Sequence, residues 1–400
     1  RNRRPARRAT DLTPARAATT PSPDLTPPDA RPRKGDQRQP SGLESNAAAA
    51  HAGRRLGCQG PRVGLSVYAA WVLVQFPAKL RVGSHVRVIA PARSRAMVTA
   101  GNGNAAIAER RLAELGLTLS YGHHVDETDR YHTSTIASRV ADLHAAFTDP
   151  SVDGILTVIG GYNSNELLPH LDFDLIGAHP KILCGYSDIT ALHNAILART
   201  GLVTYSGPHW STFGMRHHSD TTSTWFRQVL MTDRPVDLEP SPWFTDDAWF
   251  ADQDHRTPLP TDGWWPSQPG TAHGQIIGGN LATLNLLQGT PWMPSLRDAV
   301  LFLEDDELTN PVEFRRDLHS LLQLPDADTV RGLLVIGRFQ TASGITRDLE
   351  TILATVPPLA GKPIIANVDF GHTNPMITFP IGGHVELHSG SDARITLTQH

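Results

Sequence analysis

From residue 86 onward, short apolar runs alternate with stretches in which apolar positions recur at helical spacing. Residues 86–90 (VRVIA) and 154–159 (GILTVI) are almost wholly apolar, which is typical of strands buried on both faces. Residues 135–147 place apolar side chains three and four positions apart, which predicts a helix with one buried face. The same reasoning predicts strands at 86–90, 117–121 and 154–159, a further strand leading to Ser187, and helices at 105–115, 135–147, 164–170 and 189–198.

Strands that alternate with helices predict a parallel sheet covered by helices on both faces. We therefore expect residues 73–232 to form an N-terminal α/β domain. In such sheets, ligands bind beyond the carboxyl ends of the strands. The turn at Gly160 and Gly161 and the serine Ser187 each follow a predicted strand, so we expect both at this edge.

The second half of the chain is richer in strands. A glycine-rich element at 274–289 is followed by apolar runs at 299–303, 332–337, 363–368 and 384–388. This pattern predicts a smaller, strand-rich C-terminal domain over residues 273–400.

Residues 233–272 interrupt the pattern between the two expected domains. Four of the eight tryptophans lie in this segment, among aspartate, proline and glycine. We expect an aromatic lid or linker, because aromatic residues on a long polar loop more often contact a ligand than fill a core.

Residues 1–72 differ from the rest. The first 60 are rich in Arg, Pro, Ala, Ser and Thr and cannot bury enough apolar surface to offset their ordering entropy, so we expect disorder. The alternative is an artefactual extension, with translation starting near Val74, because the first methionine is Met97. Residues 63–76 are apolar but shorter than the roughly 20 residues of a membrane span, and no cleavage site of a signal peptide follows them.

Charge and cysteine usage narrow the function classes. The net charge is −4, but residues 1–72 hold 13 Lys and Arg against five Asp and Glu, so the remainder carries −12. We therefore expect no binding to nucleic acid or to an anionic membrane. Cys58 and Cys184 cannot form a disulfide framework, which favours the cytoplasm. The 19 histidines show no HExxH spacing, so we expect no metal site.

Ser187 is the first candidate for chemistry. It lies in KILCGYSDITAL (181–192), between a predicted strand and a predicted helix, where a serine hydroxyl can project as a nucleophile. Helix N-terminal amides at the same place can stabilise developing negative charge. The alternative is an ordinary helix N-cap.

An acyl-transfer serine also needs a base and an acidic partner for that base. Glu304 directly follows an apolar run in LFLEDDE, and His372 follows a turn in IIANVDFGHTNPM. Both are strand-end residues. The alternatives are a solvated acid for Glu304 and a packed loop histidine for His372.

Several motifs occur here in an order that resembles one family, the serine peptidases that include murein LD-carboxypeptidases and the microcin C self-immunity protein. The resemblance runs from about Phe76 to the C-terminus. Its carriers are VRVIAPARS, GILTVIGGYNSNELLPHLD, KILCGYSDITALHNAI, TYSGPHWSTFGM, GQIIGGNLATLNLLQGTPWMP, LFLEDDE and NVDFGHTNPM. The insert FTDDAWFADQD, followed by GWWPSQPG, looks more like the self-immunity branch.

The resemblance implies a fold and a catalytic apparatus. It implies a Rossmann-like N-terminal domain, a smaller swivelling C-terminal domain, a homodimer and no cofactor. It also implies a triad of Ser187 as nucleophile, Glu304 as acid and His372 as base. Backbone amides of Gly161 and Asp188 would form the oxyanion hole.

Substrate specificity is less defined by these motifs. The resemblance implies that Trp249 stacks on the nucleotide part of a substrate, and the alternative is that it merely closes the lid. Asn280 would bind substrate with its amide or hold the turn between the domains. No Lys-Ser or Lys-Thr follows Gly278 and Gly279, so a P-loop is not supported.

Three functions follow from these observations. The first is a serine hydrolase that cleaves an amide bond in a peptidyl- or aminoacyl-nucleotide, as in microcin self-immunity. The second is a murein tetrapeptide LD-carboxypeptidase that releases terminal D-alanine. The third is a non-catalytic ligand-binding protein with Ser187 as a cap, which would leave the three triad positions occupied by chance.

Overall fold

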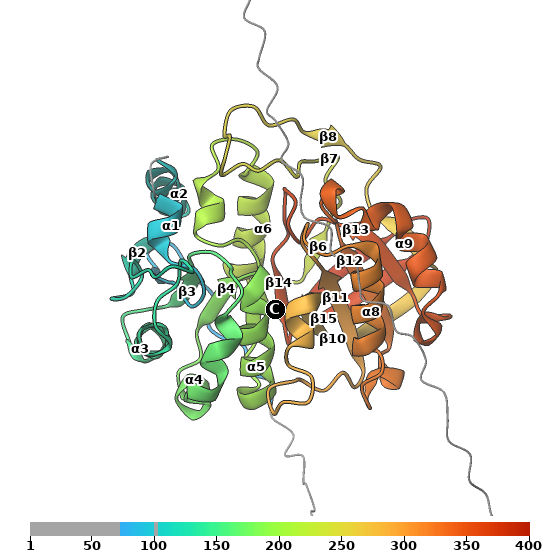
Figure 1. Cartoon of the computed structure of the whole chain (residues 1–400), viewed down its shortest axis with the longest axis horizontal. Helices are drawn as coiled ribbons and strands as arrows, with labels where there is room; N and C mark the ends of the chain where they lie inside the picture. The colour runs from blue at the N-terminus through green and yellow to red at the C-terminus, as the bar shows by residue number, and fades with distance from the viewer. Residues whose placement is uncertain (1–72, 100–102) are drawn as a thin grey trace, which may run out of the picture. The chain divides into compact units, whose positions relative to one another are not determined.

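The computed structural model describes residues 73–99 and 103–400 (Figure 1). Our predictions for residues 1–72, including those on Cys58, lie outside this part of the chain. The described residues belong to one compact unit and share one continuous hydrophobic core. Within them, no helix is both long enough and apolar enough to cross a membrane.

The N-terminal part is built on a six-stranded sheet with the order β14-β5-β4-β3-β1-β2. Its first five strands in sequence are parallel to their neighbours, and β14 pairs antiparallel with β5. The strands are β1 (His85–Ile89), β2 (Thr118–Tyr121), β3 (Gly154–Thr157), β4 (Ile182–Gly185), β5 (Thr204–Ser206) and β14 (Phe379–Ile381). The predicted parallel α/β sheet is therefore confirmed, and β14 is a strand that the chain returns to it from far downstream.

Helices separate these strands, as the alternation predicts. They are α1 (Arg95–Thr99), α2 (Asn104–Glu114), α3 (Ile136–Thr148), α4 (Phe173–Ala178), α5 (Thr190–Thr200) and α6 (Asp220–Leu230). The segment Ser164–His170 is a 3₁₀ helix (η1) rather than an α-helix, and Pro169 within it removes a backbone donor. Two further 3₁₀ turns are η2 (Ser187–Ile189) and η3 (Ser211–Gly214).

The C-terminal part is an eight-stranded mixed sheet with the order β6-β16-β15-β10-β11-β12-β13-β9. Its central strands β10 to β13 are parallel, and antiparallel strands flank them on both sides. The strands are β6 (Val236–Leu238), β9 (Trp265–Gln268), β10 (Gly270–Asn280), β11 (Ala299–Glu304), β12 (Gly332–Gly337), β13 (Ile364–Val368), β15 (His384–Ser389) and β16 (Arg394–Gln399). The helical elements are α7 (Leu281–Asn285), α8 (Pro311–Leu321), α9 (Ile345–Ala354), η4 (Ala327–Thr329), η5 (Thr341–Ser343) and η6 (Pro357–Leu359). The strand-rich C-terminal part is confirmed.

Helix α5 joins the two parts. It is buried on nearly all sides, because it packs on β5 and also on β10 and β14 (Figure 1). Asn194 on α5 donates to the carbonyl of Gly278 on β10 at 2.8 Å. A Cβ on Gly279 would lie 2.4 Å from the Thr190 hydroxyl, so only glycine allows this approach.

Residues 233–272 contain more regular structure than the expected loop. Strands β6 and β9 lie at opposite edges of the C-terminal sheet, and β7 (Trp243–Phe244) pairs with β8 (Leu259–Pro260). The partners of β6 and β9 are β16 and β13, which follow more than 90 residues later. Because β6 and β9 are short and pair with strands far away in the sequence, no local sequence pattern predicts them. The domain boundaries given above stay predictions.

Candidate active site

Ser187 lies two residues beyond the end of β4, where η2 leads into α5. Its φ is 60°, in the left-handed region that residues other than glycine rarely adopt. Such a conformation costs on the order of 1–3 kcal/mol and is concentrated at functional sites. A serine on a strained turn between strand and helix presents its hydroxyl at the edge of the sheet.

The turn that follows β3 packs directly on Ser187. A Cβ on Gly160 would lie 2.9 Å from the Ser187 Cβ and 3.1 Å from its Oγ, so a side chain at Gly160 would crowd the hydroxyl. The Asp188 carboxylate accepts hydrogen bonds from the backbone amides of Asn163 and Ser164 at 3.0 and 2.9 Å. These bonds hold the two strand-end turns together, with Gly161 in one and the Asp188 amide in the other.

Glu304 and His372 approach Ser187 from the C-terminal sheet. Glu304 is the last residue of β11, and His372 lies in the turn after β13. His372 Nδ1 is 2.8 Å from Glu304 Oε2, and His372 Nε2 is 3.0 Å from Ser187 Oγ. The structure therefore brings together three residues that are 68 and 185 positions apart in sequence.

Gly371 makes the contact between Glu304 and His372 possible. Its φ is +104°, and a Cβ there would lie 2.8 Å from Glu304 Oε2. Any other residue would be strained and would displace the carboxylate. Glycine is therefore required before His372 in FGHT for steric reasons.

The surroundings of His372 favour its charged form. Burial lowers the pKa of the imidazole, but the charge and hydrogen bond of Glu304, with the charges of Asp306 and Asp305, raise the pKa to about 9. Glu304 is 3% exposed, so its carboxylate is little screened by water. The pair is thus set to stabilise an imidazolium.

An aromatic ring packs beside His372. The Tyr186 ring lies 5.2 Å from the His372 ring and 4.3 Å from the His209 ring, measured between centroids. His209 Nδ1 is 2.7 Å from the Thr157 hydroxyl. Burial holds the pKa of His209 well below its usual value, so this ring is neutral.

A cleft of about 330 Å³ lies next to Ser187, His372 and Tyr186. Ser187 and His372 line it, as do Trp249 and Phe250 of the segment 246–250. Phe250 is 67% exposed, and the Trp249 and Phe250 rings meet edge to face. Trp249 therefore lies at the cleft, as expected for a lid residue.

Asn280 does not line this cleft. It is buried at the end of β10, its Oδ1 caps α7 by accepting from the Thr283 amide, and its Nδ2 donates to Asp305 Oδ1 at 3.0 Å. Burial, followed by the charge of Glu304, raises the pKa of Asp305 to about 7. Both ends of the Asn280 carboxamide are thus engaged within the protein, which favours its alternative role of holding the turn. Substrate binding by Asn280 stays a prediction.

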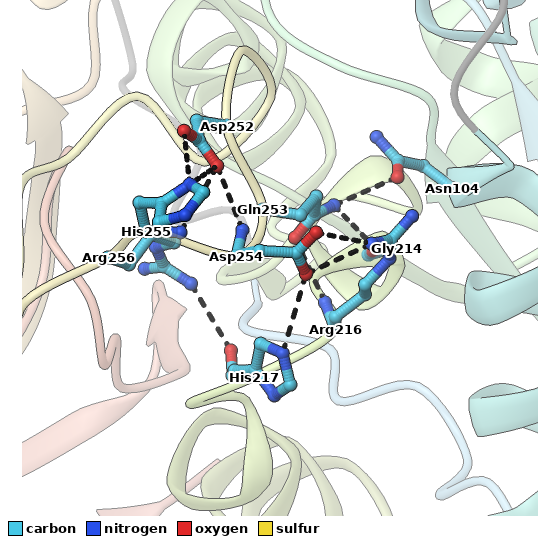
Figure 2. Close-up of polar contacts among 9 residues, drawn as sticks. All are labelled: Asn104, Gly214, Arg216, His217, Asp252, Gln253, Asp254, His255 and Arg256. Atoms are coloured by element: carbon cyan, nitrogen blue, oxygen red, sulfur yellow. Dashed lines mark hydrogen bonds and ion pairs between the residues drawn. The ribbon is translucent and has the colours of Figure 1, made fainter. Parts of the chain in front are cut away.

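The segment that carries Trp249 is anchored to the N-terminal sheet domain by Gln253 (Figure 2). Gln253 is 8% exposed, and its Oε1 accepts from the Arg216 amide at 3.0 Å. Its Nε2 donates to Asn104 Oδ1 at 2.8 Å and to the Gly214 carbonyl at 3.1 Å. One buried side chain therefore connects the lid to two separate segments of the N-terminal part.

An exposed ion pair adds to this anchor. Arg216 Nη1 lies 3.0 and 2.9 Å from the two carboxylate oxygens of Asp254, and His217 Nε2 lies 3.7 Å from Asp254. Next to it, Arg256 donates to the His217 carbonyl at 3.2 Å (Figure 2). Exposed pairs contribute roughly 0–1 kcal/mol, so Gln253 is the stronger part of the anchor.

Some site residues were not predicted from the sequence. Arg93 and Tyr162 line the cleft, and each lies three residues beyond the end of a predicted strand, a position that could have identified them. His209 and Gln253 carry no such signal, because their partners lie far away in sequence. Within residues 73–99 and 103–400, no group of three or more His, Cys, Asp or Glu is arranged to hold a metal ion.

Comparisons with known proteins agree with this architecture. Two family models match the chain, that of the LD-carboxypeptidase N-terminal domain over residues 86–207 and that of the LD-carboxypeptidase C-terminal domain over residues 273–387. The putative carboxypeptidase YocD of Bacillus subtilis is 47% identical over 81% of this chain and 100% of its own length. A probable murein peptide carboxypeptidase of the same organism is 32% identical over 71% of this chain and 84% of its own length. The microcin C7 self-immunity protein MccF of Escherichia coli is also 32% identical, over 68% of this chain and 81% of its own length.

Solved structures show the same fold. An MccF-like protein from Bacillus anthracis superimposes with a TM-score of 0.80 at 47% identity, covering 82% of this chain and 100% of that one. MccF in complex with glutamyl sulfamoyl guanosine superimposes with a TM-score of 0.72 at 28% identity, covering 82% of this chain and 99% of that one.

Fold, site and comparisons together define this protein as a peptidase. The chain belongs to the LD-carboxypeptidase family. The resemblance stated from its motifs is thereby confirmed at the level of the family.

Proposed function

We propose that this enzyme is a serine hydrolase in which Ser187 is the nucleophile, His372 the base and Glu304 the residue that orients the base. The observation that carries the proposal is the chain of two hydrogen bonds from Ser187 Oγ through His372 to Glu304, at 3.0 and 2.8 Å. Nucleophile, base and orienting acid in contact are the parts that acyl transfer needs. The strained backbone of Ser187 supports the same reading.

The reaction proceeds through an acyl-enzyme. Ser187 Oγ attacks the carbonyl carbon of an amide while His372 Nε2 takes the hydroxyl proton. The backbone amides of Gly161 and Asp188 donate to the resulting oxyanion. His372 then gives its proton to the leaving nitrogen, the C–N bond breaks, and a water molecule hydrolyses the ester with His372 again as base.

The substrate that the cleft suits best is a peptidyl- or aminoacyl-nucleotide. Trp249 and Phe250 give the cleft an aromatic wall, and aromatic side chains bind nucleobases by stacking, worth about 1–3 kcal/mol per base. A relative of this chain, MccF, binds glutamyl sulfamoyl guanosine. We propose that cleavage of the amide bond in such a compound is the reaction of this enzyme, as in self-immunity to microcin C.

A second candidate is release of terminal D-alanine from a murein tetrapeptide. The relative of B. subtilis named as a probable murein peptide carboxypeptidase favours it. The same three residues would perform the chemistry. A peptide offers no base on which Trp249 could stack, so the aromatic lid favours the first candidate.

Turnover of two substrates separates these candidates. The full chain and its Ser187→Ala variant would each receive aspartyl sulfamoyl adenosine and a murein tetrapeptide, with products followed by mass spectrometry. Cleavage of the adenosine compound alone, lost in the variant, supports the proposal. Release of D-alanine alone would replace it by the second candidate, and cleavage by Ser187→Ala would remove Ser187 as nucleophile.

A third variant tests the lid. Trp249→Ala should raise KM for the adenosine compound, and Trp292→Ala, which changes a tryptophan that does not line the cleft, should not. The homodimer and the cytoplasmic location that the resemblance implies stay predictions, to be tested by light scattering and by fractionation of cells.

A further inference from the structure

The strand order of the N-terminal sheet identifies a second place for a ligand. In the order β5-β4-β3-β1-β2, strand β1 has β2 on one side and β3 on the other. The chain therefore forms β2 on one side of β1 and then returns to form β3 on the opposite side, so the strand order reverses at β1. Ligands of open α/β sheets bind outside the carboxyl ends of the strands at such a reversal. Ser187 follows β4, one strand away from it.

A hollow of about 680 Å³ lies at this reversal. It is lined by Arg93 after β1, by residues 129–136 after β2, and by Tyr162 after β3. Arg93 and Tyr162 also line the cleft that contains Ser187. The hollow and the catalytic cleft are therefore neighbours with a shared wall, and we refer to the first as the switch-point hollow.

Arginine side chains dominate the charge of the switch-point hollow. Arg93 and Arg130 form no ion pair within residues 73–99 and 103–400, and each guanidinium lies over a tyrosine ring, at 5.0 Å from Tyr162 and 4.6 Å from Tyr131. Both tyrosines are exposed, at 63% and 62%. The hollow thus presents two cations held by planar rings toward solvent.

A buried arginine forms part of its wall. The Arg139 side chain is 2% exposed; it donates to the Asn163 carbonyl at 2.9 Å and pairs with Glu166 at 2.6 Å. Its Nη1 also donates to the Pro91 carbonyl at 3.2 Å, so the guanidinium is fixed in the wall by the protein itself. The N-terminus of the 13-residue helix α3 also opens at the hollow, and its dipole favours an anion.

The acidic residues of the hollow are engaged internally. Asp129 accepts from the backbone amides of Tyr131 and Thr133, at 2.7 and 3.2 Å, and Glu166 pairs with Arg139. The lining holds three arginines, Arg93, Arg130 and Arg139, against these two carboxylates, so its net charge is positive.

We propose that the switch-point hollow binds a carboxylate on the acyl side of the substrate, upstream of the residue whose carbonyl Ser187 attacks. The inference rests on the proposed function, because it takes the cleft beside the lid for the leaving group. An amide extends in two directions from its reacting carbon. With the aromatic lid on one side, the acyl part runs past Gly161 and Tyr162 toward Arg93 and Arg130. Amino acids and peptides carry their negative charge as carboxylate, the group that arginine binds best.

Peptide binding to the full-length Ser187→Ala variant tests this without turnover. The probes are the tetrapeptides Glu-Ala-Ala-Ala and Ala-Glu-Ala-Ala, in which the glutamate precedes the residue before the last peptide bond, and their glutamine counterparts, titrated by calorimetry. We expect at least one glutamate peptide to bind about tenfold more tightly than its glutamine counterpart, since a charge-assisted hydrogen bond is stronger than a neutral one. Adding Arg130→Gln should abolish this preference.

Arg110→Gln is the matched control, because it removes one exposed arginine of the same domain away from the hollow. It should retain the preference for glutamate. Equal binding of the paired peptides, or a preference that survives Arg130→Gln, would overturn the inference. Turnover of aspartyl sulfamoyl adenosine by the unmodified chain, run in parallel, reports on the proposed function separately, so the two can fail independently.

Discussion

At the scale of single residues, the site depends on a histidine whose charge is set by its neighbours. In the mechanism that we propose, His372 must be neutral to accept the Ser187 proton, yet Glu304 and the adjacent aspartates raise its pKa to about 9. Below that pH the imidazole is mostly protonated in the free enzyme. A base prepared in this way stabilises the imidazolium that forms during attack but limits the fraction of active enzyme at neutral pH.

We therefore expect kcat/KM to rise with pH through an apparent pKa of about 9. In Glu304→Gln the charge that raises this pKa is removed, so the limb should move to lower pH, while kcat falls on the order of 10²–10⁴-fold because the imidazolium loses its partner. The measurement is a pH profile of both enzymes. Glu350→Gln, an exposed change on α9, is the control and should keep the unmodified profile. If the apparent pKa of the pH profile is unchanged in Glu304→Gln, the assignment of Glu304 as the residue that raises the pKa of His372 is contradicted.

Gly371 gives a second prediction at this scale. Gly371→Ala should lower kcat strongly and destabilise the fold by about 1–3 kcal/mol, because its Cβ would meet Glu304 Oε2 at 2.8 Å. Gly361→Ala is a matched control, since Gly361 also has a positive φ, of +74°, but nothing lies within 4 Å of a Cβ there. It should lose stability through the backbone alone and keep its activity. The test measures the activity and the thermal melting of both variants. Equal activity of the two would show that the close approach of residue 371 to Glu304 is not needed for catalysis.

Each candidate residue could be predicted from the sequence, but the contact between the three side chains could not. Ser187, Glu304 and His372 each follow an apolar run, and this position is what the sequence reveals about them. Whether three strand ends meet depends on two sheets facing each other across α5, which is set by packing between residues far apart in the chain. The internal engagement of Asn280 is likewise visible only once Asp305 and Thr283 are placed beside it.

At the scale of elements, strands β1 to β4 of the parallel sheet and helix α3 were predictable, and several other short elements were not. The α3 pattern has a clear apolar face and a Thr135 cap. Helix α8 was missed although its start, Asn310-Pro311-Val312-Glu313, is a capping box with proline at the first helical position. Strand β14 has three residues and an antiparallel partner more than 170 positions earlier, so it has no local signal.

The lid is the element for which the structure makes a sharp prediction. Gln253→Ala removes three hydrogen bonds and leaves the partly buried Arg216 amide and the buried Gly214 carbonyl without them, which costs about 1–3 kcal/mol locally. We expect KM for the adenosine compound to rise roughly five- to 100-fold with little change in kcat, because the triad is untouched.

The exposed pair should matter much less. Asp254→Asn should change KM by less than about fivefold, as solvent weakens the pair with Arg216. Gln323→Ala, an exposed glutamine of the C-terminal part, is the control for the loss of an amide. Hydrogen exchange across residues 246–257 should quicken in Gln253→Ala only. A kcat effect equal to the KM effect would show that the lid acts on chemistry and not on binding.

At the scale of the whole molecule, the two sheets are interlocked rather than merely adjacent. Strand β14 leaves the C-terminal part to pair with β5, α5 is covered by both sheets, and one hydrophobic core runs through them. Lys79 Nζ donates to His400 Nδ1 at 2.7 Å, and His400 Nε2 lies 2.7 Å from the Arg234 carbonyl. Both parts therefore contribute to one shared core.

This interlocking predicts a single cooperative unfolding transition. Calorimetry of the full chain should give one peak for residues 73–400, with the calorimetric and van't Hoff enthalpies in agreement, although two-state behaviour becomes less common at this size. Two resolved transitions would mean that the sheets unfold as independent domains.

The division of the reacting residues between the two sheets has a further consequence. Ser187 belongs to one sheet, whereas Glu304 and His372 belong to the other, and β14 fastens the two at its pairing with β5. The hydrogen bond between Ser187 Oγ and His372 Nε2, at 3.0 Å, therefore crosses from one sheet to the other. Any change in how the two sheets pack would alter this distance, so the proposed catalytic contact depends on the packing of the whole molecule.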